Sequence, residues 1–340
     1  MVFPGESWKI KTPESEGIDS GKLEQALKYL KEHSDVYGLE EAVLIRNGYL
    51  IWSGDRIDRQ HRVWSVSKTF TSTVLGILCD LGICSIDTTV ARFIPELLTW
   101  YPEVTFRHLV TMTSGYKAAE ASCSSSKTPL EWQKPDHKPG EVYFYNNDGM
   151  HLLACALTCA AGEPIRKIFQ RYVADRIGIT DWQWGTLGEF GGRTVHGGTD
   201  NLGCGISITA KDLARFGHLF LNGGCWKESQ VLSSFWVNQA TAVQVSPALK
   251  NLPYKQDNEF TGSGVYGFNW WVNGCKASRQ RLMPDAPPKT FFASGAHHNK
   301  CYVVPEWNLV FVRMGTGDSL KKGHEVYNRF FDKLKKAVHE

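Results

Sequence analysis

The chain has 340 residues, of which 42% are hydrophobic and 21% charged, a composition typical of a globular protein with one large domain or two interlocked ones. Its net charge of +3 is too small to predict a nucleic-acid or anionic-membrane partner, and no apolar run is long enough to span a bilayer. Residues 1–10 lack the apolar core of a signal peptide, so we expect a cytoplasmic protein unless a leader has been removed. The nine cysteines form no C-x-x-C pair, and no convincing dinucleotide or phosphate-loop fingerprint is present, so we expect free thiols, no metal and no cofactor.

The first 84 residues predict a helix, a hairpin and a second helix. Apolar residues recur at helical spacing over 22–32, and two β-rich runs within 41–52 flank Asn47-Gly48, a strong hairpin signal. A long helix that is apolar on most faces begins near Ser65 and ends at Gly82. The apolar surface of this second helix predicts a central, buried position.

The middle of the chain predicts an inserted, mostly helical domain over residues 85–234. Residues 117–140 are polar and rich in serine and proline, which indicates a long surface loop of the kind that often serves as a lid or binding loop. Helices are expected at 106–112, 148–161, 165–177 and 209–221.

The last third predicts short strands and a terminal amphipathic helix at 326–338. Because strands are expected near both ends of the chain, one sheet built from both termini is predicted, with residues 1–84 and 235–340 forming an α/β domain. The catalytic cleft is then expected between this domain and the insertion. The strands are expected at 267–272, 290–293, 300–304 and 309–314.

Three local patterns carry possible chemistry. Ser65 and Lys68 are one helical turn apart and meet on one face, so a lysine with a lowered pKa can take the serine proton and leave an acyl-accepting nucleophile. Tyr145 and Asn147, two apart in an extended segment, can point the same way; the phenol can shuttle a proton as phenolate beside an ammonium, and the amide can bind lysine or substrate. Alone, the first pattern also fits a chance spacing of two common residues, and the second fits a turn in which Asn147 or Asp148 caps the next helix.

The third pattern is Ala293-Ser294-Gly295-Ala296, at the end of a predicted strand. The backbone N–H groups of Ala296 and Ser65 can form an oxyanion hole, and Gly295 allows a substrate to approach the strand closely. Alone, the pattern is also that of a common strand-to-turn junction.

Together these motifs resemble the β-lactamase and penicillin-binding-protein superfamily of serine hydrolases, nearest to its class C, esterase and 6-aminohexanoate-oligomer hydrolase branch. The order S-x-x-K, Y-x-N and a small-residue strand motif is the family's, and the similarity extends over about residues 15 to 335. Longer family-like stretches lie at 107–115, 139–147, 209–217 and 266–271. The resemblance implies an antiparallel sheet flanked by helices, with the inserted helical domain beside it.

The resemblance also implies roles for individual residues. Ser65 would be the acylated nucleophile, activated by Lys68, and Tyr145 would be the general base and then the acid for the leaving group. Asn147 would position substrate, and the N–H groups of Ser65 and Ala296 would hold the oxyanion. Trp132 and Trp184 are the tryptophans that we expect nearest the pocket.

One departure from the family pattern bears on the substrate. The third motif of true β-lactamases and peptidases begins with a lysine that binds a substrate carboxylate, and Ala293 stands in its place. A lost cation of that kind weakens anion binding by about 2–5 kcal/mol, which favours substrates without the carboxylate. His297 or His298 could supply a polar or cationic substitute.

The sequence therefore predicts an α/β serine hydrolase that acts on a small ester or amide, with the ester preferred and the oligomeric state undetermined. A β-lactamase or D-alanyl-D-alanine carboxypeptidase is the enzymatic alternative. A non-catalytic binding or scaffold protein with the same fold is the alternative from another class, and the retention of Ser65, Lys68, Tyr145 and Asn147 argues against it.

Overall fold

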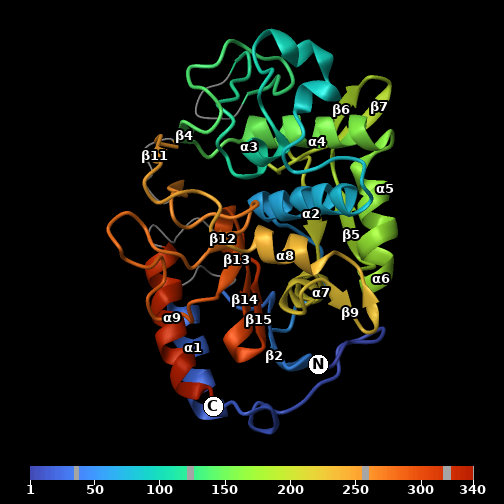
Figure 1. The fold of residues 1–340 in the computed structure, drawn as a ribbon. Coiled ribbons are helices and arrows are strands. Elements are labelled where there is room, and N and C mark those ends of the chain that lie inside the picture. The colour runs from blue at the N-terminus through green and yellow to red at the C-terminus, as the bar shows by residue number, and fades with distance from the viewer. Residues whose placement is uncertain (34–37, 121–125, 255–259, 317–322, 340) are drawn as a thin grey trace.

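The centre of the molecule is a six-stranded antiparallel sheet built from both ends of the chain (Figure 1). The structure is a computed structural model that describes residues 1–33, 38–120, 126–254, 260–316 and 323–339. The strand order is β12-β13-β14-β15-β1-β2, so the C-terminal strands pair directly with the N-terminal hairpin. The strands are β1 (Ala42–Arg46), β2 (Tyr49–Ser53), β12 (Trp271–Val272), β13 (Phe291–Gly295), β14 (Asn299–Val304) and β15 (Leu309–Arg313).

The β1–β2 hairpin forms because its turn residues tolerate a left-handed backbone. Asn47 has φ 53° and Gly48 has φ 88°, the positive values that a tight two-residue hairpin turn requires. A side chain on Gly48 would also collide with the Val2 carbonyl, since its Cβ would lie 1.9 Å from that oxygen. The predicted hairpin is confirmed.

Two helices from opposite ends of the chain cover one face of this sheet. α1 (Ser20–Glu32) and α9 (Gly323–Ala337) lie side by side there (Figure 1). The contact is aromatic: the Tyr302 ring of β14 lies 5.2 Å from Tyr327, and Phe311 of β15 lies 4.9 Å from Phe330. These apolar contacts bury the amphipathic faces that the sequence predicted for both helices.

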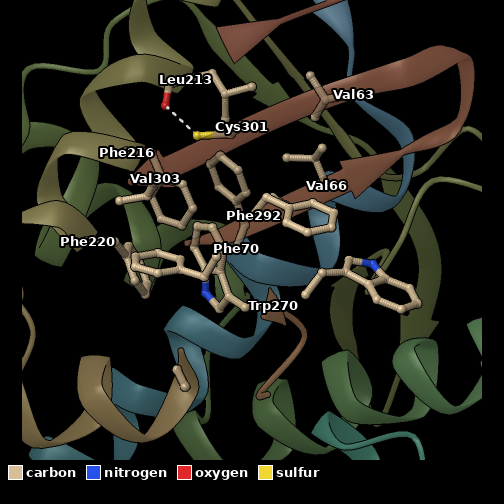
Figure 2. Packing of buried hydrophobic residues seen from close by; sticks show 14 of the residues in the cluster. Val63, Val66, Phe70, Leu213, Phe216, Phe220, Trp270, Phe292, Cys301 and Val303 are labelled. Atoms are coloured by element: carbon tan, nitrogen blue, oxygen red, sulfur yellow. Dashed lines mark hydrogen bonds between the residues drawn. The ribbon is translucent and has the colours of Figure 1, made fainter. Parts of the chain in front are cut away.

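The opposite face of the sheet packs on α7 (Ala210–Leu221). Gly217 allows this approach, because a Cβ there would lie 2.7 Å from Cys301 Sγ and 2.8 Å from Val310. Figure 2 shows Phe216, Phe220 and Trp270 packed in the layer between sheet and helices. One face of β14 and β15 thus meets α7, and the other meets α9.

α2 (Ser67–Asp80) runs through the middle of the molecule, and residues 67 to 78 are all buried. Phe70 stacks on Phe216 at 4.3 Å, which ties α2 to α7. Gly76 packs on the ring of Trp236 in α8 (Ser234–Ala240), where a Cβ would lie 2.6 Å from the indole. The predicted central position of this helix is confirmed, while α8 was not predicted.

The region between residues 85 and 234 contains the expected helices and additional short strands. A helix spanning 165–177 is confirmed, with its central residues Gln170–Ala174 wound as a π-helix. The expectation of a mostly helical insertion missed seven short strands among the described residues, because runs such as Trp182–Trp184 are too short for their period to be recognised. Besides α7, the helices here are α3 (Phe106–Val110), α4 (Asn147–Ala161), α5 (Ile165–Phe169) and α6 (Asp175–Ile177), and the strands include β5 (Trp182–Trp184), β6 (Thr186–Phe190), β7 (Arg193–His196) and β8 (Ile206–Ile208).

The small strands tie the insertion to the rest of the chain. β3 (His61–Arg62), just before α2, pairs with β8, and β8 pairs with β5. The described part of the predicted loop 117–140 contains one isolated bridge between Ala118 and Trp132, and residues 121–125 lie outside the description. The division into two domains stays a prediction. The remaining strand pairs are β6 with β7, β4 (Val142–Tyr143) with β11 (Lys250–Asn251) and β9 (Cys225–Trp226) with β10 (Ser229–Gln230).

In the C-terminal third, three of the four predicted strands are present nearly as expected. The fourth is much shorter than the predicted 267–272, because Asn269 has φ 62° and breaks the extended backbone. Among the described residues, no helix is both long and apolar enough to cross a membrane.

Candidate active site

Ser65 lies in a short 3-10 turn, Trp64–Val66, between β3 and α2. Trp64, the residue before it, has φ 53°, an uncommon value for a bulky side chain. Such backbone strain persists where the surrounding structure enforces it, and it is frequent at functional sites. The predicted helix start at Ser65 was thus two residues early, since α2 begins at Ser67.

Lys68 is in hydrogen-bonding distance of Ser65, with 2.8 Å between Nζ and Oγ. The lysine is 1% exposed, and its burial lowers the pKa of the amine well below the usual range, while nearby Asp200 acts in the opposite direction. Burial penalises the charged form, so the site favours a neutral amine with a free lone pair beside the serine. The sequence pattern required a lowered lysine pKa for this proton transfer, and burial of Lys68 meets that condition, while the role as base stays a prediction.

Tyr145 closes the other side of Ser65. Its side chain is hydrogen-bonded to Ser65, and Lys68 Nζ lies 4.6 Å from its ring centre. Burial raises the pKa of the Tyr145 phenol well above its usual value. The suggested phenolate beside an ammonium is therefore disfavoured, because burial lowers the pKa of Lys68 and raises that of Tyr145, and so favours the neutral form of each group.

Asn147 is the first residue of α4 and donates to the Tyr254 hydroxyl at 3.1 Å. The helix cap is Asn146, which accepts from the N–H of Gly149, so Asn147 is not needed for capping. The alternative of Asn147 or Asp148 as the cap was therefore wrong.

An aromatic cluster that was not predicted from the sequence surrounds the Tyr145 ring. Tyr254 and Phe260 lie 5.3 Å and 4.9 Å from it, and Trp271 stacks at 6.3 Å. Tyr254 and Phe260 come from the two sides of residues 255–259, which lie outside the described residues, and Trp271 comes from β12. The three aromatic rings pack around Tyr145, which is 3% exposed.

Of the two tryptophans expected near the pocket, Trp184 lies in the packed interior. It is buried in β5, donates to the Gly197 carbonyl at 2.8 Å and packs on Phe169 and Trp182. Trp132 bridges to Ala118 in the polar loop, and its place near the pocket stays a prediction.

β13 passes directly against the Ser65 turn. A Cβ on Gly295 would lie 2.2 Å from the Val63 carbonyl and 3.1 Å from the Ser65 backbone nitrogen, so only glycine fits there. The backbone that leads into Ala296 therefore runs close to the backbone nitrogen of Ser65, as an oxyanion hole made from both would require.

The turn after Gly295 contains two consecutive left-handed residues, His297 at φ 57° and His298 at φ 61°. Arg313 fixes this turn, because its guanidinium donates to the carbonyls of both histidines at 3.0 Å and 3.2 Å. His297 packs 4.9 Å from Trp64, which places it beside the serine turn. Burial lowers the pKa of His298 to about 3, so this histidine is neutral and does not supply the cation that the sequence left open.

A cation near the strand motif comes from the adjacent strand instead. Ser294 pairs with Lys300 of β14, and Lys300 Nζ donates to Ser294 Oγ at 2.5 Å. Position 293 itself carries no lysine, but strand pairing places Lys300 on the same sheet face as Ser294. The preference for substrates without a carboxylate therefore stays a prediction. The Lys300 side chain also lies over the Tyr327 ring at 5.7 Å and is mostly buried.

A contact from the insertion to Lys68 was also not predicted from the sequence. The loop between β7 and β8 brings Thr199 Oγ1 to 2.7 Å from Lys68 Nζ, and Asp200 follows it. Arg62 of β3 holds the Asp200 carboxylate at 2.9 Å. Since Thr199 is 131 positions from Lys68 along the chain, no local pattern could have identified it.

This arrangement has the parts of a nucleophilic catalyst. The Ser65 hydroxyl lies within hydrogen-bonding reach of a buried amine and of a phenol, next to a strand whose Gly295 allows a close approach to its backbone. Among the residues that the structure describes, no group of three or more His, Cys, Asp and Glu side chains is arranged to hold a metal ion.

The beta-lactamase family model matches residues 44–330, and the chain belongs to this family. The family and its relatives are hydrolases, so the class that the fold and site define is a hydrolase with a β-lactamase-like fold. The predicted fold class and family resemblance are confirmed.

Particular relatives illustrate the range of the family. The chain is 25% identical over 239 residues to the 6-aminohexanoate-dimer hydrolase of Paenarthrobacter ureafaciens, covering 64% of this chain and 59% of that protein. The structure of EstCE1, described as a hydrolase with promiscuous acyltransferase activity, matches with a TM-score of 0.68 at 15% identity, over 93% of this chain and 98% of that one. A penicillin-binding-protein homologue from Caulobacter crescentus matches with a TM-score of 0.69 at 14% identity, over 95% and 99%.

Proposed function

We propose that this protein is a serine hydrolase that cleaves a small ester or amide through an acyl-enzyme on Ser65. The observation that carries the proposal is the 2.8 Å contact between Ser65 Oγ and the buried Lys68 amine, whose pKa is lowered by desolvation. A neutral amine at this distance is a competent general base for a serine hydroxyl. A non-catalytic binding protein with the same fold would not need Lys68 buried in a way that favours its neutral form.

In the proposed mechanism, Lys68 takes the Ser65 proton as Oγ bonds to the substrate carbonyl carbon. The N–H groups of Ser65 and Ala296 stabilise the oxyanion of the tetrahedral intermediate. Tyr145, protonated at neutral pH, gives its proton to the leaving alcohol or amine and recovers one from the Lys68 ammonium. Water then attacks the acyl-enzyme and gives a proton to the neutral Lys68 amine. As the tetrahedral intermediate collapses, Lys68 returns that proton to Ser65 Oγ, which releases the acid and the free serine. Asn147 positions the substrate.

The contact between Lys300 and Ser294 supports acceptance of substrates with a negative group. Ser294 Oγ accepts from the lysine, so its own proton is left to donate, and charge-assisted hydrogen bonds of this kind are about twice as strong as neutral ones. Linear amides with a terminal carboxylate are such substrates, and the relative from Paenarthrobacter is named for the 6-aminohexanoate dimer. β-Lactams also carry a carboxylate and are the second candidate class.

The substrate class is tested with wild-type protein and Lys300→Met on three compounds: p-nitrophenyl acetate, the linear 6-aminohexanoate dimer and a chromogenic cephalosporin. We expect kcat/KM for the ester or the dimer to exceed that for the cephalosporin by about tenfold or more. Lys300→Met should lower kcat/KM for the two carboxylate-bearing compounds by roughly 10-fold relative to the ester, since one charge-assisted contact is worth about 1.5–3 kcal/mol.

Three outcomes would contradict parts of this account. Faster cephalosporin turnover than either other compound would favour a β-lactamase. An equal loss of kcat/KM for all three compounds in Lys300→Met would overturn the role of Lys300 in anion recognition. Turnover of none, with no reaction of Ser65 toward an acyl-like probe, would favour a non-catalytic protein.

A further inference from the structure

The loop from His196 to Gly205 is held rigidly where it meets Lys68. His151 of α4 accepts from the Gly198 N–H at 3.3 Å through Nδ1, and its Nε2 lies 2.8 Å from Asn201 Oδ1. Burial lowers the pKa of His151 to about 4, so the ring is neutral and can accept at one nitrogen while it donates at the other. A Cβ on Gly198 would lie 1.8 Å from the Met150 carbonyl, so the loop contacts the α4 backbone directly.

Two further elements fix the same loop. Thr71 of α2 donates to the Gly198 carbonyl at 3.2 Å, and the Asp200 carboxylate accepts from the Gly205 N–H at 2.9 Å. Arg62 binds the second carboxylate oxygen of Asp200 while lying over the Trp64 ring at 4.6 Å. Thr199 is therefore placed by α2, α4 and β3 together, and it is 1% exposed.

We propose that Thr199 is a positioning residue for Lys68. The Thr199 hydroxyl accepts an N–H of the Lys68 amine, and this contact turns the lone pair of the lysine nitrogen toward Ser65. A neutral lysine has two N–H groups and one lone pair on a freely rotating amine, so the serine contact alone does not determine which of them faces Oγ. The 2.7 Å contact to Thr199 fixes one N–H on the side away from the nucleophile. This inference rests on the proposed function, because it assigns a partner to the proposed base.

Asp200 adds a charge effect to this geometry. The groups that face the amine are Tyr145, neutral His151 and the Asp200 carboxylate, and Arg62 partly neutralises the last of these. A nearby carboxylate favours the protonated form of Lys68 and so raises the pKa of its amine. That pKa sets the pH below which Lys68 can no longer act as a base. Removing the carboxylate should therefore move the acid limb of the activity to lower pH. Removing Arg62 should move it to higher pH.

The test uses the rate at which a fluorophosphonate labels Ser65, because this reaction needs an activated serine but no knowledge of the natural substrate. Oγ bonds to phosphorus, fluoride leaves, and the serine proton passes to Lys68. We expect Thr199→Val to lower the plateau rate at high pH by about 10–100-fold, since small misplacements of a catalytic group have effects of this size. Thr199→Ser, which keeps the hydroxyl, should remain within about threefold of wild type.

The same assay across pH distinguishes positioning from a packing effect. Asp200→Asn, which keeps an acceptor for Gly205, should shift the acid limb down by about one pH unit, and Arg62→Gln should shift it up. If Thr199→Val does not fold, Thr199→Ala replaces it. If the wild type is labelled and the variant without the Thr199 hydroxyl is labelled at the same rate, the positioning role of Thr199 is overturned and the proposed function is not. An unlabelled wild type would overturn the proposed function and this inference with it.

Discussion

Replacing Ser65 by alanine is expected to lower kcat/KM for p-nitrophenyl acetate by about 10⁴-fold or more. The hydroxyl is the atom that bonds to the substrate in the proposed mechanism, and removing the nucleophile of a serine hydrolase leaves only substrate binding and the oxyanion hole. The side chain is small and half-buried in the turn Trp64–Val66, so the fold should persist. Steady-state kinetics and thermal unfolding of both proteins measure the two effects.

Ser67 provides a matched control in the same turn. Its hydroxyl accepts from the Ile206 N–H at 2.8 Å and is buried away from Lys68 in a structural contact. Ser67→Ala should cost stability, about 1–3 kcal/mol for a buried donor left unpaired, while the loss in kcat/KM stays below about tenfold. Ester hydrolysis by Ser65→Ala at more than a few per cent of the wild-type rate would exclude Ser65 as the nucleophile.

Replacing Lys68 by arginine is expected to be as damaging as replacing it by methionine, with a loss in kcat/KM of about 10³-fold in each. Arginine keeps the positive charge but cannot lose its proton in a protein, so it cannot act as a base. Methionine removes both the charge and the base. General-base catalysis by a positioned side chain typically contributes about 10²–10⁴-fold.

The comparison decides which residue is the base. If Lys68→Arg retained most of the activity while Lys68→Met lost it, the lysine would act as a cation and Tyr145 would be the base, as the family resemblance implied. The burial of the Tyr145 phenol, which raises its pKa, argues against that result. Circular dichroism and thermal unfolding would verify that both variants are folded, since Lys68 is fully buried.

Local patterns in the sequence predicted the parts of the site that are local in the chain. Ser65 and Lys68 are three residues apart, and Tyr145 and Asn147 are two apart, so helix and strand geometry was enough to place each pair on one face. The family resemblance then brought the two pairs together. The structure agrees, with Lys68 between the Ser65 hydroxyl and the Tyr145 ring.

Contacts between distant segments could not be predicted in the same way. Lys300 lay inside a predicted strand, but its contact with Ser294 depends on the register of β13 and β14, which no turn signal specified. Thr199 and Asp200 lie in a stretch of glycines and short strands without a recognisable period. The burial of Trp184 and of His298 could not be predicted for the same reason, because it comes from packing between elements far apart in the sequence.

The most direct test of the account is peptide mass spectrometry after treatment of the wild-type protein with a fluorophosphonate, with Ser65→Ala and Lys68→Arg treated in parallel. The account predicts one phosphonyl adduct in the wild type, on the peptide that contains Ser65, and none at that site in either variant. An adduct on a different residue, or equal labelling of Ser65 in Lys68→Arg, would contradict the claim that the Lys68 amine activates Ser65.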